Sequence, residues 1–243
     1  YAMTLYSDSK YPVRNAIVEA HQHTLASFSV PGTWWTGAQR AAIVAEARDA
    51  RCEAGLQKPA AAETKAPTDL PESTRRGARQ VAVSTNKLDR GFFEQAVSDG
   101  LSDAEYVETV GVAARLTCVD VFARGIGVPS AEIAQPADGE PTSQRPATAR
   151  DEGAWAESIP GGRRGKQEAI DTYGTDMIEA APFIYRSLSL VPEEAKGLIG
   201  LGSAQYVALE EFMNFDFRFD PGFSRSQVEL VAGRISAINE CFY

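Results

Sequence analysis

SQVELVAGRISAINECFY, residues 226–243, is the stretch that decides the fold and most of the functional interpretation. Ser226 followed three residues later by Glu229 is typical of a capping box at a helix start. The apolar residues recur at helical spacing and form one stripe, made of Val228, Val231, Ala232, Ile235 and Ile238. The stretch therefore predicts a core-facing helix that runs into Cys241.

A second stretch, GAQRAAIVAEARDARCEAG at Gly37 to Gly55, has the same outline of a turn, an Ala-rich helix and a cysteine. Cys52 lies twelve residues after Arg40, and Cys241 lies twelve residues after Glu229. We interpret the two stretches as divergent copies of one helical unit.

The chain divides at a stretch that lacks any hydrophobic period. Residues 131–165 contain four prolines and no helical pattern, which is typical of a linker. We therefore expect a first, degenerate helical repeat at 1–130 and a second repeat at 166–243. The predicted fold is all-α, with the two repeats packed into one body.

Other segments of the sequence also carry clear patterns. Leu56 to Gln80 is interrupted by prolines and predicts a long connector, whereas Ser102 and Glu105 form a capping box before a helix at about 103–124. Further helices are predicted at 11–28, 87–100, 167–190 and 192–213. In the Trp34-Trp35 turn, one ring should pack into the core and the other should line a groove or a subunit contact.

Charge and composition exclude several classes of partner. The formal net charge is -9, from 33 acidic and 24 basic residues, and the short cluster Arg163, Arg164 and Lys166 suits a solvated loop. Nucleic acid is not expected, because phosphate binding needs a concentrated basic face. No apolar run approaches the ~20 residues that span a bilayer. With three cysteines and no signal sequence, we expect a soluble, cytoplasmic protein without a membrane partner.

Four segments together resemble the alkyl-hydroperoxidase D and carboxymuconolactone decarboxylase family, in its two-repeat, peroxidase-related form. They are GTWWTGAQRAAIVAEARDARC, GLSDAEYVETVGVAARLTCVDVFARGIGVP, RSLSLVPEEAKGLIGLGSAQY and the string ending in ECFY. The resemblance covers about two thirds of the chain. It implies duplicated helical halves and a homo-oligomer, and it is better evidence of fold than of chemistry.

The sequence departs from the motif that the resemblance implies. Redox members of the family use a Cys-x-x-Cys pair, a His four residues beyond it and an upstream Glu. The first copy has Arg40 in place of the Glu and Gly55 in place of the second cysteine, so we expect it to be catalytically silent. The second copy keeps Glu229 and Cys241 but stops at Tyr243, so we expect this repeat to be cut short.

The predicted site is therefore Cys241 with Glu229. A thiolate attacks a peroxide oxygen, and a helix starting at Cys241 would favour that anion. Twelve residues of helix span ~18 Å, so Glu229 could act only through a group on a helix that folds back against it. The hypothesis is a thiol-dependent hydroperoxide reductase that takes electrons from an external dithiol. In the competing interpretation, Glu229 only caps Ser226 and Cys241 has no chemical role.

Two alternatives come from other functional classes. A cofactor-free lactone decarboxylase would act on a small lactone or carboxylate and would need a basic pocket residue such as Arg40. A catalytically silent helical scaffold would need no site. No cofactor is expected in any of the three. His21 and His23 point about 200° apart on a helix, so they cannot chelate one metal ion, and no metal site is expected. Cys118 is expected to be an inert, buried side chain.

Overall fold

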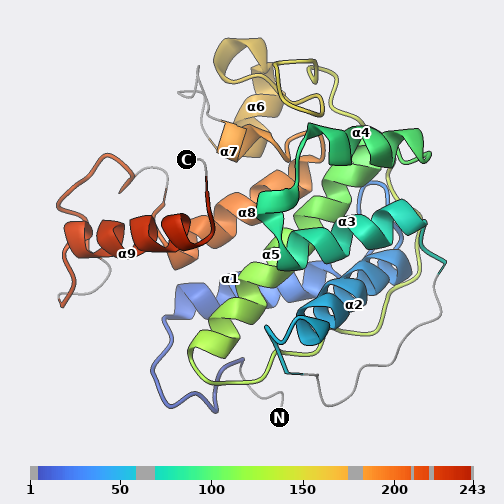
Figure 1. Ribbon diagram of the computed structural model, residues 1–243. Helices are drawn as coiled ribbons and strands as arrows, with labels where there is room; N and C mark the ends of the chain where they lie inside the picture. Colours follow the sequence, from blue (N-terminus) through green and yellow to red (C-terminus); the bar gives the residue numbers. More distant parts are fainter. Residues whose placement is uncertain (1–4, 59–68, 175–182, 209–210, 219–221, 242–243) are drawn as a thin grey trace.

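The computed structural model describes residues 5–58, 69–174, 183–208, 211–218 and 222–241 (Figure 1). The described part is helical and contains no strand; one isolated bridge joins Arg150 and Ser158. The prediction of an all-α fold is confirmed.

The helices are described here in chain order. They are α1 (Asn15–Ser27), α2 (Gly37–Glu53), α3 (Glu72–Val83), η1 (Thr85–Lys87), α4 (Arg90–Ser98), α5 (Asp103–Gly125), η2 (Gly162–Arg164), α6 (Lys166–Tyr173), α7 (Phe183–Arg186), α8 (Pro192–Gln205) and α9 (Arg225–Ile238). The long helix α5 runs through the centre, and α1, α2, α3, α4 and α8 all pack against it (Figure 1).

Helix α5 begins where the sequence predicts. The Ser102 side chain accepts a hydrogen bond from the Glu105 backbone, and the Glu105 carboxylate accepts one from the Ser102 backbone. These two bonds satisfy backbone donors that the first helical turn leaves open. The main core lies where α5 meets α2 and α3. Its fully enclosed side chains include Phe28, Ile43, Val112, Ala113 and Leu116.

The structure places helix α3 inside the region predicted to be a connector. Gly77, Ala78 and Val81 are buried on one side of α3, while Arg76 and Arg79 lie on the other, more exposed side. This is an amphipathic helix whose buried residues are mostly small, so its helical pattern is weak in the sequence. The nearby prolines therefore favoured the prediction of a connector. The prediction of a connector is wrong for residues 72–80.

The second half of the chain packs onto the first. Helix α8 contacts both α1 and α5, and it ends at Gln205 rather than at Met213 as predicted. The helix predicted at 167–190 corresponds to α6 and α7, and residues 175–182 between them lie outside the described part. The duplication of the two halves stays a prediction.

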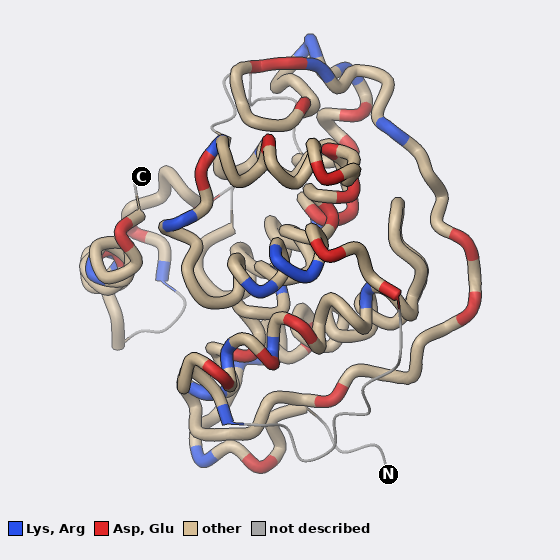
Figure 2. Tube along the Cα trace, turned by 45° about the vertical axis from the view of Figure 1, so that its right-hand side comes forward, with Lys and Arg blue, Asp and Glu red and all other residues tan. Residues whose placement is uncertain are grey.

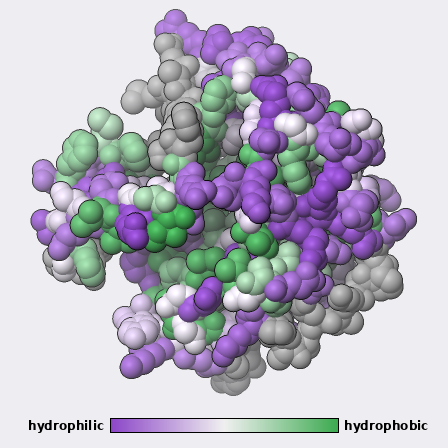
Figure 3. Space-filling model, in the orientation of Figure 1, coloured by the Kyte–Doolittle hydropathy of each residue, from purple (hydrophilic) through white to green (hydrophobic). Residues whose placement is uncertain are grey.

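Helix α9 is not core-facing, which corrects the prediction from its apolar stripe. It makes no extensive contact with another described helix, and it lies to one side of the body (Figure 1). Leu230, Val231 and Ile238 have exposed fractions of 75%, 59% and 62%. These side chains give α9 an apolar surface, visible in Figure 3. Near its end, Asn86 donates a 2.7 Å hydrogen bond to Glu240.

No described helix combines the length and the apolar character that a membrane crossing requires. Figure 2 shows Lys and Arg interleaved with Asp and Glu along the described chain. Basic side chains do not gather on one face in that view, in agreement with the acidic composition.

Candidate functional site

Cys241 lies just beyond the C-terminal end of α9 and is exposed. Its backbone N–H donates a 2.9 Å hydrogen bond to the Ser236 carbonyl, and Glu240 has a left-handed φ of 53°. This is the geometry that closes a helix rather than one that opens a helix. The end of α9 carries the negative side of the helix dipole, so α9 provides no helix N-terminus to stabilise a thiolate at Cys241.

Glu229 lies in the first half of α9, with two partners that fix its carboxylate. The Tyr206 hydroxyl and the Arg225 guanidinium each donate a 2.5 Å hydrogen bond to it. These bonds lower the pKa of Glu229, with Tyr206 as the larger cause, so the carboxylate is ionised at neutral pH.

Glu229 does not cap α9. Ser224 is the N-cap, and Gln227 completes the capping box with it. The interpretation of Glu229 as the capping partner of Ser226 is therefore wrong. The helical rise from Glu229 to the end of α9 at Ile238 is ~14 Å, and Cys241 lies beyond that end, so the two groups do not meet within this chain.

Tyr206 and Arg225 are partners of Glu229 that were not among the predicted site residues. Arg225 is buried, and it donates further 3.2 Å hydrogen bonds to the carbonyls of Glu211 and Phe212. The four-residue spacing from Arg225 to Glu229 is a visible helical signal. Tyr206 follows the end of α8, and no pattern in the sequence links it to α9.

The other two cysteines differ from Cys241 in exposure. Cys52 and Cys118 are half-buried, whereas Cys241 is exposed. Burial raises the pKa of the Cys118 thiol, and Arg115 opposes this shift only in part. The expectation that Cys118 is an inert packing residue agrees with this environment, since it lies against Leu25, Val119 and Leu201.

Arg40 belongs to a buried ionic cluster that joins α2, α5 and α8. Its guanidinium pairs with Glu108, and its Nη2 lies 3.0 Å from Glu194 Oε1. Arg115 pairs with the other oxygen of Glu194 at 2.6 Å. The exposed fractions of these four side chains are 5% or less.

Charge balance explains why this cluster is tolerated in the core. Burial would lower the pKa of Arg40, but the carboxylates of Glu194 and Glu108 outweigh that cost and raise it. Burial raises the pKa of Glu108, because the stabilisation by Arg40 and by the Trp34 N–H does not fully replace water. Two arginines against two carboxylates leave no net charge within this cluster.

Glycines make room for the cluster. A Cβ atom at Gly32 would lie 1.9 Å from Glu108 Oε1, and one at Gly111 would lie 2.6 Å from Glu194 Cβ. Both donor faces of Arg40 are already engaged, and its side chain is only 4% exposed. Arg40 therefore holds helices together and is not open to a substrate carboxylate.

His21 lies in a second buried polar group. Gln205 donates from its amide to Nε2 at 2.7 Å, which places the proton of the neutral ring on Nδ1, 2.6 Å from the Tyr6 hydroxyl oxygen. Burial lowers the pKa of His21 to about 4. His23 is exposed, and the described residues contain no cluster suited to a metal ion.

We expect His21 to make folding sensitive to acid. Its folded pKa of about 4 lies below the ordinary 6.5, so the folded protein binds fewer protons than the unfolded one. The stability that depends on neutral His21 is complete above 6.5 and falls, by on the order of 2 kcal/mol, as the pH drops toward 4. Urea unfolding of His21→Gln should show a weaker decline over this range than the wild type. The exposed matched control His23→Gln should keep the full decline; an equal change in both variants would contradict the assignment.

Comparisons with protein-family models, with curated proteins and with solved structures find no match to this chain. The resemblance to the alkyl-hydroperoxidase D family therefore stays a prediction from the quoted segments.

Proposed function

We propose that this protein is a thiol-dependent hydroperoxide reductase with Cys241 as its redox centre. The observation that carries the proposal is the contrast among the cysteines: Cys241 is exposed, whereas Cys52 and Cys118 are half-buried in the helical body. A peroxide and a thiol donor can both reach an exposed sulfur. This accessibility distinguishes reactive cysteines from structural ones.

The proposed cycle needs one protein thiol and an external dithiol. The Cys241 thiolate attacks the hydroperoxide, the O–O bond breaks, and a sulfenic acid forms on Cys241. The alkoxide that leaves takes a proton from water and becomes the alcohol. One thiol of the donor then displaces water and forms a mixed disulfide. The second donor thiol attacks that disulfide, leaves the donor oxidised and regenerates Cys241.

Glu229 has a more limited part in this proposal than the sequence pattern suggested. Its carboxylate accepts the Tyr206 hydroxyl proton in a 2.5 Å hydrogen bond, at the far end of α9 from Cys241. The ~14 Å of helix between Glu229 and Ile238 excludes direct proton transfer between Glu229 and the thiol. Its proposed role is structural: it holds Tyr206 and Arg225 in place where α9 begins.

The other two functional classes receive less support. A lactone decarboxylase would need a basic group facing a substrate carboxylate, and Arg40 is enclosed by Glu108 and Glu194. A silent scaffold is the outcome if Cys241 shows no peroxide chemistry. Trp35 of the aromatic turn packs inside the chain and is not free for a subunit contact. The exposed apolar side chains of α9 are the candidate surface for the predicted homo-oligomer.

We expect Cys241→Ser to abolish the consumption of cumene hydroperoxide in the presence of dithiothreitol. Cys52→Ser and Cys118→Ser, the matched controls, should each retain most of the activity, since neither sulfur forms the sulfenic acid. Trapping with a dimedone probe after one peroxide addition should label the wild type at Cys241 alone. Full activity in Cys241→Ser, or no peroxide consumption by the wild type, would end the proposal.

A further inference from the structure

An apolar cavity of about 350 Å³ lies between α4, α5, α7 and the segment 153–156. Its walls include Phe93, Tyr106, Val107, Trp155, Phe183 and Leu188, and none of its lining residues is charged. The volume falls in the range of small-molecule sites, roughly 300–1,000 Å³. The lining includes neither Cys241, Glu229 nor Tyr206, so this cavity is distinct from the proposed redox site.

Tyr106 and Ser187 are the two lining residues with a side-chain hydroxyl, and because Ser187 is exposed, Tyr106 is the buried one. Its side chain is only 5% exposed, and its ring packs edge-on against Phe93 with centroids 5.1 Å apart. Its hydroxyl forms no hydrogen bond with any residue that the structure describes. The hydroxyl is not among the buried polar atoms that lack a partner, so water reaches it through the cavity and a ligand that enters can replace that water.

The protonation state of Tyr106 determines whether its hydroxyl can donate a hydrogen bond to a ligand. Burial, with a smaller effect from the charge of Asp89, raises the pKa of Tyr106 to about 12. The hydroxyl is therefore protonated at neutral pH, and it is available as a hydrogen-bond donor.

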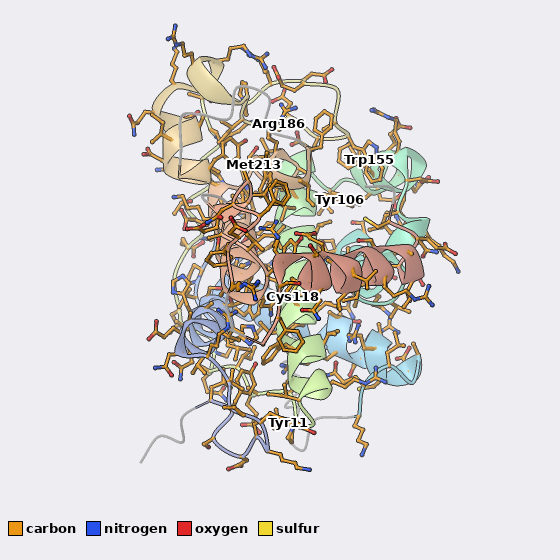
Figure 4. All side chains as sticks on the ribbon, turned by 90° about the vertical axis from the view of Figure 1, so that its left-hand side faces the viewer. Tyr11, Tyr106, Cys118, Trp155, Arg186 and Met213 are labelled. Atoms are coloured by element: carbon orange, nitrogen blue, oxygen red, sulfur yellow. The ribbon has the colours of Figure 1, made fainter. Side chains whose placement is uncertain are left out.

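Aromatic rings form the opposing part of the wall. Trp155, with an exposed fraction of 41%, lies toward the outside, and Figure 4 labels Trp155 and Tyr106 in the same upper region of the molecule. The Arg186 guanidinium lies 4.6 Å from the Phe183 ring centroid and pairs with Glu152 at 3.2 Å. A second cation, Arg90, donates a 3.4 Å hydrogen bond to the carbonyl of the lining residue Ala154. Neither Arg186 nor Arg90 is among the lining residues.

We propose that this cavity binds a neutral, flat aromatic molecule that carries one hydrogen-bond acceptor, such as an aryl ketone. The oxygen accepts from the Tyr106 hydroxyl, and the ring packs against Phe183 and Trp155.

The residues that line the cavity favour a neutral aromatic ligand with an acceptor over anions, pure hydrocarbons and alkyl chains. A carboxylate or phosphate would lose its hydration without meeting a cation. A pure hydrocarbon would leave the Tyr106 hydroxyl without a partner. An aromatic ring gains from offset or edge contacts with the aromatic side chains, which an alkyl chain does not.

The test uses two probes of the same shape: acetonaphthone, and its isopropenyl analogue in which a methylene group replaces the carbonyl oxygen. Equilibrium dialysis against the full chain measures the dissociation constant of each. We expect the ketone to bind about fivefold to tenfold more tightly than the alkene, because only the ketone accepts the hydrogen bond.

Tyr106→Phe should bring this ratio close to one and leave the affinity for the alkene unchanged. It removes only an unpartnered hydroxyl, so the fold should persist, which circular dichroism checks. Tyr11→Phe, at a tyrosine that is 57% exposed and far from the cavity in Figure 4, is the matched control and should keep the preference. Trp155→Ala should weaken both probes severalfold.

Three results would overturn the proposal. The first is no binding of either probe at concentrations up to about 1 mM, which corresponds to a negligible affinity for a preformed site. The second is a ketone preference that survives in Tyr106→Phe. The third is an equal loss of preference in Tyr11→Phe.

Discussion

Arg40→Met should lower the free energy of unfolding by about 3–5 kcal/mol, one of the two largest changes we expect. The substitution keeps the length of the side chain but removes the positive charge between Glu108 and Glu194. Glu194 still pairs with Arg115, whereas Glu108 keeps only the Trp34 backbone N–H at 2.6 Å. An uncompensated carboxylate then remains in a fully buried position. Urea denaturation monitored by circular dichroism measures the change.

Arg79→Met is the matched control for this prediction. Arg79 also contacts two carboxylates, Glu46 and Glu53, but its side chain is 34% exposed. Ion pairs in contact with water contribute about 0–1 kcal/mol, so this variant should be close to the wild type. Similar losses in the two variants would show that the Arg40 cluster does not behave as a buried one. Adding Glu108→Gln to Arg40→Met should recover part of the loss.

The cost of Arg40→Met should also depend on pH. Burial already raises the pKa of Glu108, and Arg40 opposes that shift, so its removal should raise this pKa further. A carboxyl group with a raised folded pKa binds a proton more readily in the folded state. Its contribution to stability is present at low pH and is lost as the pH rises through the folded pKa. The variant should therefore lose more stability, relative to the wild type, at pH about 8 than at pH about 5.

Gly111→Ala should destabilise the protein by about 1–3 kcal/mol, against the usual trend for helices. Alanine is normally better than glycine inside a helix by about 1 kcal/mol. At Gly111, however, the new Cβ atom would lie 2.6 Å from Glu194 Cβ and 2.7 Å from Glu194 Oε2. The helices α5 and α8 would have to separate, and the pairing of Glu194 with Arg115 would be disturbed.

Gly200→Ala provides the matched control in α8. A Cβ atom at this position meets no other atom within 4 Å. This variant should gain about 0.5–1 kcal/mol from helix propensity alone. The same unfolding experiment measures the change in the free energy of unfolding for both variants. A loss in Gly111→Ala and a gain in Gly200→Ala would support the close approach of α5 and α8. A gain in both would contradict it.

Capping patterns and hydrophobic content predicted the helical class and much of the element order. The Ser102 and Glu105 capping box located the start of α5 to the residue, because its two hydrogen bonds depend on local chain geometry alone. The same pattern at Ser226 and Glu229 predicted the wrong capping residues for α9, because Ser224 and Gln227 form an equivalent capping box two residues earlier.

The site was less predictable than the fold. The spacing of Arg40 and Cys52 matches that of Glu229 and Cys241, yet Arg40 is buried among carboxylates and Glu229 lies on an exposed helix. The partners of Arg40 lie 68 and 154 residues away along the chain. Hydrophobic periodicity relates residues a few positions apart, so it cannot predict ion pairs between residues this far apart in the sequence.

By itself, the sequence determined the helical class, the start of α5 and the presence of two candidate groups, one on the last helix and one just after it. These depend on periodicity and on side chains within four residues of each other, which act before any distant contact forms. Only the tertiary structure decided that Arg40 holds α2, α5 and α8 together, that Glu229 meets Tyr206, and that Tyr106 faces an apolar cavity. Burial and charge pairing arise when segments from different parts of the chain meet, and burial sets both the cost of a charge and the availability of a hydroxyl.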